Sequence, residues 1–94
     1  MRYEVRVTED AVRSLNQLPK RVRVRCWAEI KLLADRPRPA SSGALQGKLR
    51  GLRRIRIGDY RIAYRVDDSS SVVVVHWAGH RSRIYEEIGR RTQS

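Results

Sequence analysis

Residues 53–66, which read RRIRIGDYRIAYRV, decide the fold. Isoleucines alternate with arginines before Gly58-Asp59, and a similar alternation of apolar and basic residues resumes after it. A period of two is typical of a strand with one buried face, and a Gly-Asp pair between two such runs favours a tight turn. We therefore predict a β-hairpin in which the isoleucines are buried and several arginines share the opposite, open face. The arginines assigned to that face are Arg54, Arg56 and Arg61.

The segment before the hairpin predicts one strand and two helices. Residues 2–7 alternate, as expected of a strand, and Thr8 followed by two acidic residues is typical of a helix N-cap. Pro19 separates two helical patterns, which cover residues 9–18 and about 20–35. Residues 36–43 hold two prolines, two serines and a glycine, so we expect a loop there.

The segment after the hairpin predicts a buried strand and a short final element. Residues 71–77 include a β-branched run that is apolar on both faces, which indicates a central strand. We expect Ala78-Gly79 to end it, a short strand or helix over 81–88, and a polar, frayed tail over 89–94. The predicted order is β-α-α-β-β-β. It is an α+β fold in a single domain, residues 1–94, with a mostly antiparallel sheet, helices on one sheet face, and the other face left for function.

The charge balance points to a polyanionic partner. Lysine and arginine total 21 against 10 acidic residues, a net charge of +11. Such an excess repels itself in the folded state, which favours nucleic acid first and an acidic protein second as a partner. The single cysteine, Cys26, rules out an internal disulfide and fits a reducing cytoplasm. We find no apolar signal core, no run long enough to span a membrane, and too few cysteines and histidines to favour zinc.

Three residues beyond the central strand complete a candidate site for cleaving RNA without a metal. Attack by the 2′-hydroxyl needs a base, cations around the phosphorane and an acid at the leaving oxygen. His80 titrates near neutral pH, Tyr85 can do so among cations, and Arg81 adds charge. Alternative interpretations are a turn histidine that caps backbone groups for His80 and a core aromatic for Tyr85. The predicted catalytic residues are Arg54, Arg56, Arg61, His80, Arg81 and Tyr85. The predicted RNA-binding residues are Lys48, Arg50 and Arg53. An alternative interpretation of Arg53 is a solvated residue at a strand edge.

Three motifs resemble the RelE/ParE toxin superfamily, and the resemblance covers nearly the whole chain. They are LQGKLRG at 45–51, RIRIGDYRIAY at 54–64, and Gly79-His80-Arg81 with Ile84-Tyr85. RelE-like members are ribosome-dependent endoribonucleases that cut mRNA in the ribosomal A site without a metal or cofactor and are silenced by a RelB-like antitoxin. The resemblance implies basic active-site residues at Arg54, Arg56, Arg61 and Arg81, with a tyrosine at Tyr85.

The resemblance leaves the target and the general base open. ParE-like members share the fold but poison DNA gyrase, and the Gly-His-Arg run with its following tyrosine favours RelE. A third hypothesis is a catalytically weak relative that serves as a repressor partner of its antitoxin. RelE itself carries lysines where this chain has Arg54 and Arg56, and arginine cannot readily give up its proton. Our hypothesis is that His80 or Tyr85 acts as the base, while the arginines bind phosphate.

Overall fold

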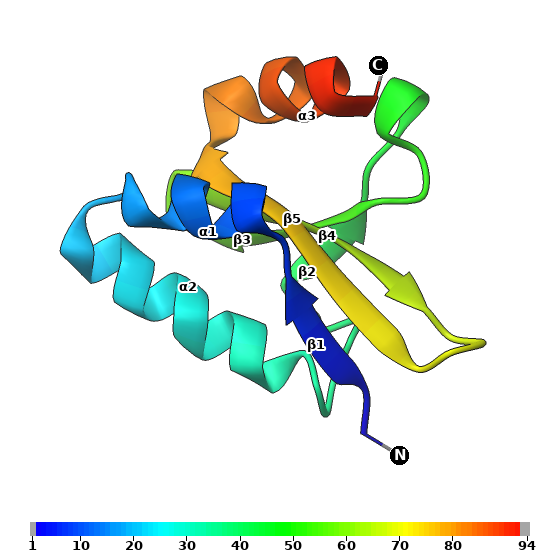
Figure 1. Cartoon of the computed structure of the whole chain (residues 1–94). Coiled ribbons are helices and arrows are strands. Elements are labelled where there is room, and N and C mark those ends of the chain that lie inside the picture. Colours follow the sequence, from blue (N-terminus) through cyan, green and yellow to red (C-terminus); the bar gives the residue numbers. More distant parts are fainter. Residues whose placement is uncertain (1, 93–94) are drawn as a thin grey trace.

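The computed structural model describes residues 2–92 as a five-stranded sheet with helices on both sides. Helices α1 and α2 lie on one side of the sheet, and α3 lies on the other with the short 3-10 helix η1 (Figure 1). The elements in chain order are β1 (Glu4–Val7), α1 (Glu9–Asn16), α2 (Lys20–Leu32), β2 (Ser42–Ala44), η1 (Gly47–Leu49), β3 (Arg53–Ile57), β4 (Tyr60–Asp67), β5 (Val72–His80), η2 (Arg81–Arg83) and α3 (Ile84–Thr92). None of the helices within residues 2–92 has the length and apolarity needed to cross a membrane.

The strand order is β1-β5-β4-β3-β2, which confirms the predicted α+β fold. β1 runs parallel to β5, and the other three pairings are antiparallel. The predicted hairpin is β3–β4, in which Arg56 faces Arg61 and Gly58 has a φ of 58°. That backbone angle lies in the left-handed region, where glycine has no steric penalty. β5 lies between β1 and β4, as expected of a strand that is apolar on both faces.

The larger core fills the space between the sheet and helices α1 and α2. The Thr8 side chain caps α1 by accepting a hydrogen bond of 3.0 Å from the Ala11 N–H, as the sequence predicted. Cys26 is fully buried, and this burial raises the pKa of its thiol to about 11. The buried members of this core are Ala11, Leu15, Cys26, Ile30, Leu33, Ile55, Ile57, Ile62, Tyr64, Val73, Val75 and Ala78.

A second, smaller core covers the middle of the opposite sheet face, which the sequence predicted to be open. α3 and the η1 loop pack here because each contributes leucine or isoleucine side chains that need an apolar partner. Its members are Leu45, Leu49, Leu52, Ala63, Trp77, Ile84 and Ile88. The face available to a partner is therefore reduced to the ends of the sheet.

Three predicted boundaries were wrong. The predicted loop, residues 36–43, includes Ser42 and Gly43, but these pair with β3 as part of the edge strand β2, so their backbone groups have sheet partners. β5 does not end at Trp77 but continues to His80, because Ala78 and Gly79 pair with β4. The predicted tail begins inside α3, which runs to Thr92 and is anchored by the buried Ile84 and Ile88. Residues 93–94 of that tail lie outside the described part of the chain.

A β-bulge at His76 changes which face each later side chain of β5 occupies. Ala63 pairs with Trp77, while the next residue, Tyr64, pairs with Val75, so β5 has one extra residue between these pairs. Val75 therefore lies in the larger core while Trp77 lies in the second one. An extra residue of this kind reverses the alternation beyond it.

Candidate nucleic-acid interface

Four of the predicted arginines lie together at one end of the sheet, and we call this group the arginine patch. Its members are Arg54, Arg56, Arg61 and Arg81. Arg56 faces Arg61 across β3 and β4, and Arg61 faces Gly79 across β4 and β5. The backbone N–H of Arg81 donates to the Asp59 carbonyl at 2.8 Å, which holds the residue after β5 against the hairpin turn.

The guanidinium of Arg61 lies within electrostatic range of the other three members of the patch. Partial burial lowers the pKa of Arg61, and the positive charges of Arg56, Arg54 and Arg81, in that order, lower it further. One carboxylate, Asp59, opposes this effect and lies 3.9 Å from the Nε of Arg81. Four cations therefore face one anion, an arrangement that a bound polyanion would relieve.

Local contacts orient two of these side chains. Nη1 of Arg61 donates to the carbonyls of Gly58 at 2.9 Å and Tyr60 at 2.8 Å, so its guanidinium is held near the turn. The Arg54 guanidinium lies against Gly43, where a Cβ would come 3.2 Å from its Nη2. Because Gly43 has no side chain, the Arg54 guanidinium can lie against the backbone of β2.

His80 does not join the arginine patch. Its ring lies on the opposite sheet side, edge to face with Tyr60 at a centroid distance of 5.6 Å. Its Nδ1 accepts a hydrogen bond of 3.2 Å from the Ser82 N–H and lies 2.9 Å from the Ser82 hydroxyl. The ring thus caps η2, which matches the alternative interpretation of a histidine that caps backbone groups.

The other predicted site residues are dispersed. Tyr85 is 55% exposed in the first turn of α3, which excludes its alternative as a core aromatic. Arg53 shares its sheet face with Ile55, opposite to Arg54, and its Nη2 donates to the Ser42 hydroxyl at 2.8 Å. The exposed Lys48 and Arg50 line a separate cavity of about 330 Å³, whose lining also includes Arg65 and His76.

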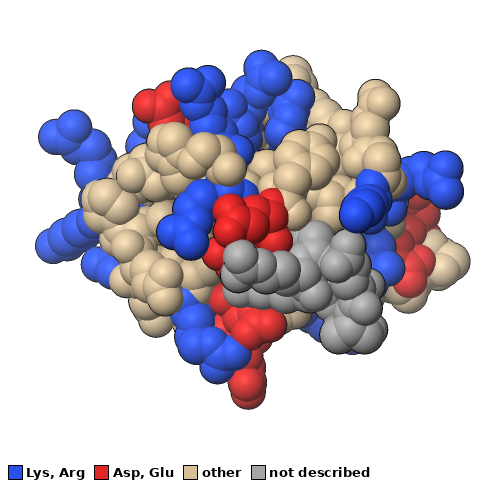
Figure 2. Space-filling model, turned by 90° about the horizontal axis from the view of Figure 1, so that it is seen from above, with Lys and Arg blue, Asp and Glu red and all other residues tan. Residues whose placement is uncertain are grey.

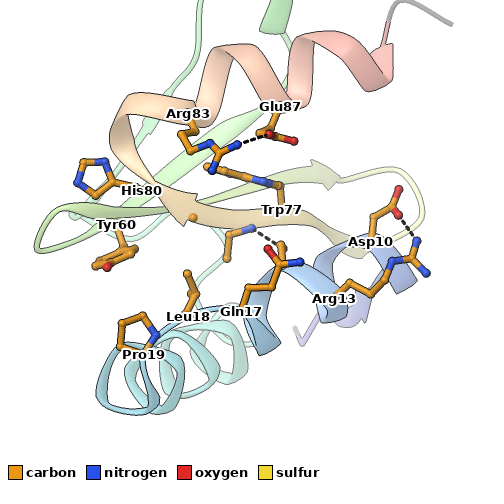
Figure 3. Close-up of a pocket in the computed structure, with 13 residues that line it drawn as sticks. Asp10, Arg13, Gln17, Leu18, Pro19, Tyr60, Trp77, His80, Arg83 and Glu87 are labelled. Atoms are coloured by element: carbon orange, nitrogen blue, oxygen red, sulfur yellow. Dashed lines mark hydrogen bonds and ion pairs between the residues drawn. The ribbon is translucent and has the colours of Figure 1, made fainter.

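A further cavity of about 340 Å³ lies between α1, the end of β5 and α3, and we call it the edge pocket (Figure 3). β1 pairs with Val72–Val75, so within residues 2–92 no strand lies beside the last residues of β5 on this side. The residues that give the edge pocket its chemistry are Arg13, Gln17, Tyr60, Trp77, His80 and Arg83. The sequence did not predict this pocket, because only the bulge at His76 turns His80 towards it.

The surface seen from the α3 side is bordered by positive charge. Lys and Arg side chains lie around much of its rim, and a group of Asp and Glu lies near the middle of the view (Figure 2). On α3, the carboxylate of Glu87 is bound by Nη2 of Arg83 at 3.1 Å. Positive charge therefore borders the face on which the arginine patch lies.

Comparison with known proteins identifies relatives along almost the full chain. Residues 5–85 match the family model of the ParE toxin of the type II toxin–antitoxin system parDE. Toxin RelG of Mycobacterium tuberculosis is 36% identical over 86 residues, which cover 90% of this chain and 98% of RelG. Toxin RelE of the same organism is 32% identical over 84 residues, which cover 88% of this chain and 86% of that protein.

Solved structures agree with this assignment. The toxin–antitoxin complex RelBE2 from M. tuberculosis contains a chain that matches with a TM-score of 0.76 and 32% identity, covering 85% of this chain and 99% of that one. A mutant of Escherichia coli toxin RelE in the free state matches with a TM-score of 0.75 and 26% identity, covering 97% and 98%. The chain therefore belongs to the RelE/ParE superfamily of type II toxin–antitoxin toxins and, within it, to the RelE-like branch.

Proposed function

We propose that this toxin is an mRNA interferase, a metal-independent endoribonuclease that cuts mRNA in the ribosomal A site and so inhibits translation in the cytoplasm. The observation that carries the proposal is the arginine patch, in which mutual repulsion contributes to the lowered pKa of Arg61. Binding RNA phosphates there relieves the repulsion and releases counterions from the RNA. Toxins of the RelE-like branch are related to this chain along most of its length.

The patch supplies the electrostatic part of the reaction. When the 2′-hydroxyl attacks the adjacent phosphate, negative charge grows on the phosphorane oxygens, and guanidinium groups can stabilise it with paired N–H donors. Arg61 is suited to this because two carbonyls already hold its guanidinium. A donor that is fixed before the reaction has little reorganisation to undergo during it.

Tyr85 is our candidate for moving protons. Arginines remain protonated, and the His80 ring is engaged with Ser82 and Tyr60 on the other side of the sheet. Tyr85 is exposed and lies in the first turn of α3, which begins directly after η2, the segment that contains Arg81. We expect Tyr85→Phe to slow cleavage by roughly 10²- to 10⁴-fold and His80→Gln to change it little. The reverse result would assign the proton transfer to His80.

Primer extension on ribosome-bound mRNA tests the proposal. The wild type should cut only where ribosomes occupy the message, and Arg81→Ala should lose most of the cutting. The matched control is Arg65→Ala, because Arg65 lies further along β4 on the face of Arg61 but opposite Val74, outside the patch. Cuts in naked RNA at the same positions would refute ribosome dependence. The absence of cuts by the wild type would refute nuclease activity.

We also propose a RelB-like antitoxin as partner. The matching structures include RelE–RelB complexes from Pyrococcus horikoshii and E. coli. A segment with acidic and apolar residues would cover the arginine patch or displace α3 from the second core. Its affinity should fall as salt is raised, and salt-independent binding would count against contact with the patch.

The alternative function is a ParE-like DNA gyrase inhibitor, a binding protein rather than an enzyme. The family model that matches residues 5–85 favours it, because its description names ParE. Trapping of gyrase with cleaved DNA, together with intact mRNA in the primer-extension experiment, would establish this alternative. Growth that is unaffected by the toxin alone would instead indicate an inactive relative.

A further inference from the structure

We propose that the edge pocket binds one unstacked nucleobase of the RNA whose phosphates lie on the arginine patch. The inference rests on the proposed function and adds to it a subsite that selects sequence. Two properties of the pocket support it. The rings of Tyr60 and His80 place the pocket on the opposite side of the sheet end from the patch, and the lining combines these two rings and an amide with charged side chains whose formal charges cancel.

Strand register places the edge pocket and the arginine patch back to back. Arg61 pairs with Gly79, and the adjacent residues Tyr60 and His80 pair with each other. Successive side chains of a strand point to opposite faces, so Arg61 belongs to the patch while Tyr60 and His80 line the pocket. Arg81 follows His80 directly, so an RNA strand that crosses this end of the sheet can contact both sites.

Charge assigns the phosphate to the patch and the base to the pocket. Two arginines line the pocket, and each is paired with a carboxylate that also lines it, Arg13 with Asp10 and Arg83 with Glu87 (Figure 3). Their formal charges cancel, whereas the patch has four arginines against Asp59. A phosphate would gain little in a neutral pocket, whereas an uncharged base loses only the hydration of its polar edge groups, which hydrogen bonds in the pocket can offset.

The pocket offers the contacts that single-stranded RNA bases use. The rings of Tyr60 and His80 stand at the end of the pocket opposite Asp10, and the Gln17 side chain extends towards the interior (Figure 3). Unstacked bases are recognised by stacking on such rings and by hydrogen bonds to their edges, for which an amide supplies both donor and acceptor. The volume of about 340 Å³ lies within the roughly 300–1,000 Å³ range of small-molecule sites.

Trp77 provides a direct reporter of occupancy. It lines the pocket, whereas the chain's other tryptophan, Trp27, packs against the larger core and does not line the pocket. In a Trp27→Phe background, adenosine, guanosine, cytidine and uridine should alter Trp77 fluorescence, at least one of them more than the others. Binding of these uncharged probes should be almost independent of salt, and ribose 5-phosphate should leave the signal unchanged.

Variants separate the subsite from the reaction. Gln17→Ala and Tyr60→Ala should weaken nucleoside binding by roughly tenfold. In ribosome-bound cleavage they should redistribute the cuts among codons, whereas Arg81→Ala should lower cutting at every position. Asn16→Ala is the matched control, because Asn16 is the exposed last residue of α1, next to Gln17, and does not line the pocket. Gln17 is also exposed, so Gln17→Ala tests the idea even if Tyr60→Ala does not fold.

The outcomes distinguish failure of the inference from failure of the proposed function. If the wild type cuts mRNA but no nucleoside alters Trp77 fluorescence and Gln17→Ala keeps the wild-type cleavage pattern, the inference is overturned and the nuclease assignment stands. If nucleosides bind but no mRNA is cut, the nuclease assignment fails and the base site remains. A signal from acidic peptides and none from nucleosides would assign the pocket to a protein partner and overturn the inference.

Discussion

Replacing Arg56 with glutamine should stabilise the fold and weaken RNA binding at the same time. Arg56 lies directly opposite Arg61, so two positive charges face each other across β3 and β4. Like charges in this position are destabilising, and cross-strand pairs contribute roughly 0.2–1 kcal/mol. Arg56 is exposed, so water screens part of the repulsion and we take about 0.5 kcal/mol.

That energy corresponds to a measurable shift. In a domain of this size, 1 kcal/mol moves Tm by about 4–8 °C, so Arg56→Gln should raise Tm by about 2–4 °C in thermal unfolding at low salt. At 1 M salt the Debye length falls to about 3 Å and the gain should vanish. Loss of one phosphate contact should reduce the slope of log affinity against log salt by about 0.7 for a single-stranded RNA.

The control is the same substitution at a position where the charge is attracted rather than repelled. Arg38 donates to both carboxylate oxygens of Asp68, at 3.2 and 2.8 Å, so Arg38→Gln should lower Tm at low salt. If Arg56→Gln also lowers Tm, or raises Tm as much at 1 M salt as at low salt, charge repulsion within the arginine patch does not destabilise the folded protein. An unchanged salt slope would show that Arg56 contacts no phosphate.

Three further outcomes follow from buried or paired groups. Hydrogen bonds from Arg38 and Tyr3 hold the pKa of Asp68 below its ordinary value, so the stability that they add is present above about pH 4 and is lost as the pH falls further. Asp68→Asn should therefore lower Tm at pH 7 and match the wild type near pH 2. Gly79→Ala should lower the free energy of unfolding by about 1–3 kcal/mol, because the new Cβ collides with the Trp77 ring, as denaturant titration can measure. The Cys26 thiol, fully buried and with its pKa raised to about 11, should resist alkylation in the native protein and react once the chain unfolds.

The hairpin and its arginines could be predicted because local rules are sufficient there. Alternation sets the face of Ile55 and Ile57, and Gly58 adopts the positive φ that the turn requires. Neither feature depends on a distant part of the chain. The same is true of Thr8, whose side chain caps the helix that begins at the next residue.

The second core could not be predicted, because it depends on contacts between distant segments. Leu49 and Ile88 are separated by 39 positions in the sequence and are both buried in it. Each segment alone is too short for its apolar period to show which sheet face it would cover. The sequence therefore suggested an open functional face, whereas the structure leaves the arginine patch at one end of the sheet and the edge pocket beside it.

The sheet face on which His80 lies is set by one extra residue in β5. Val72–Val75 is apolar on both faces, so its sequence cannot reveal where alternation reverses. With regular alternation from Val75 onwards, His80 would share the face of Arg61 and could serve there as a base. The bulge at His76 moves it to the opposite side, against Tyr60. The patch consequently retains charge without a histidine, and the edge pocket gains an aromatic ring. In our proposal the proton-transfer role passes to Tyr85, which lies on α3 directly after η2.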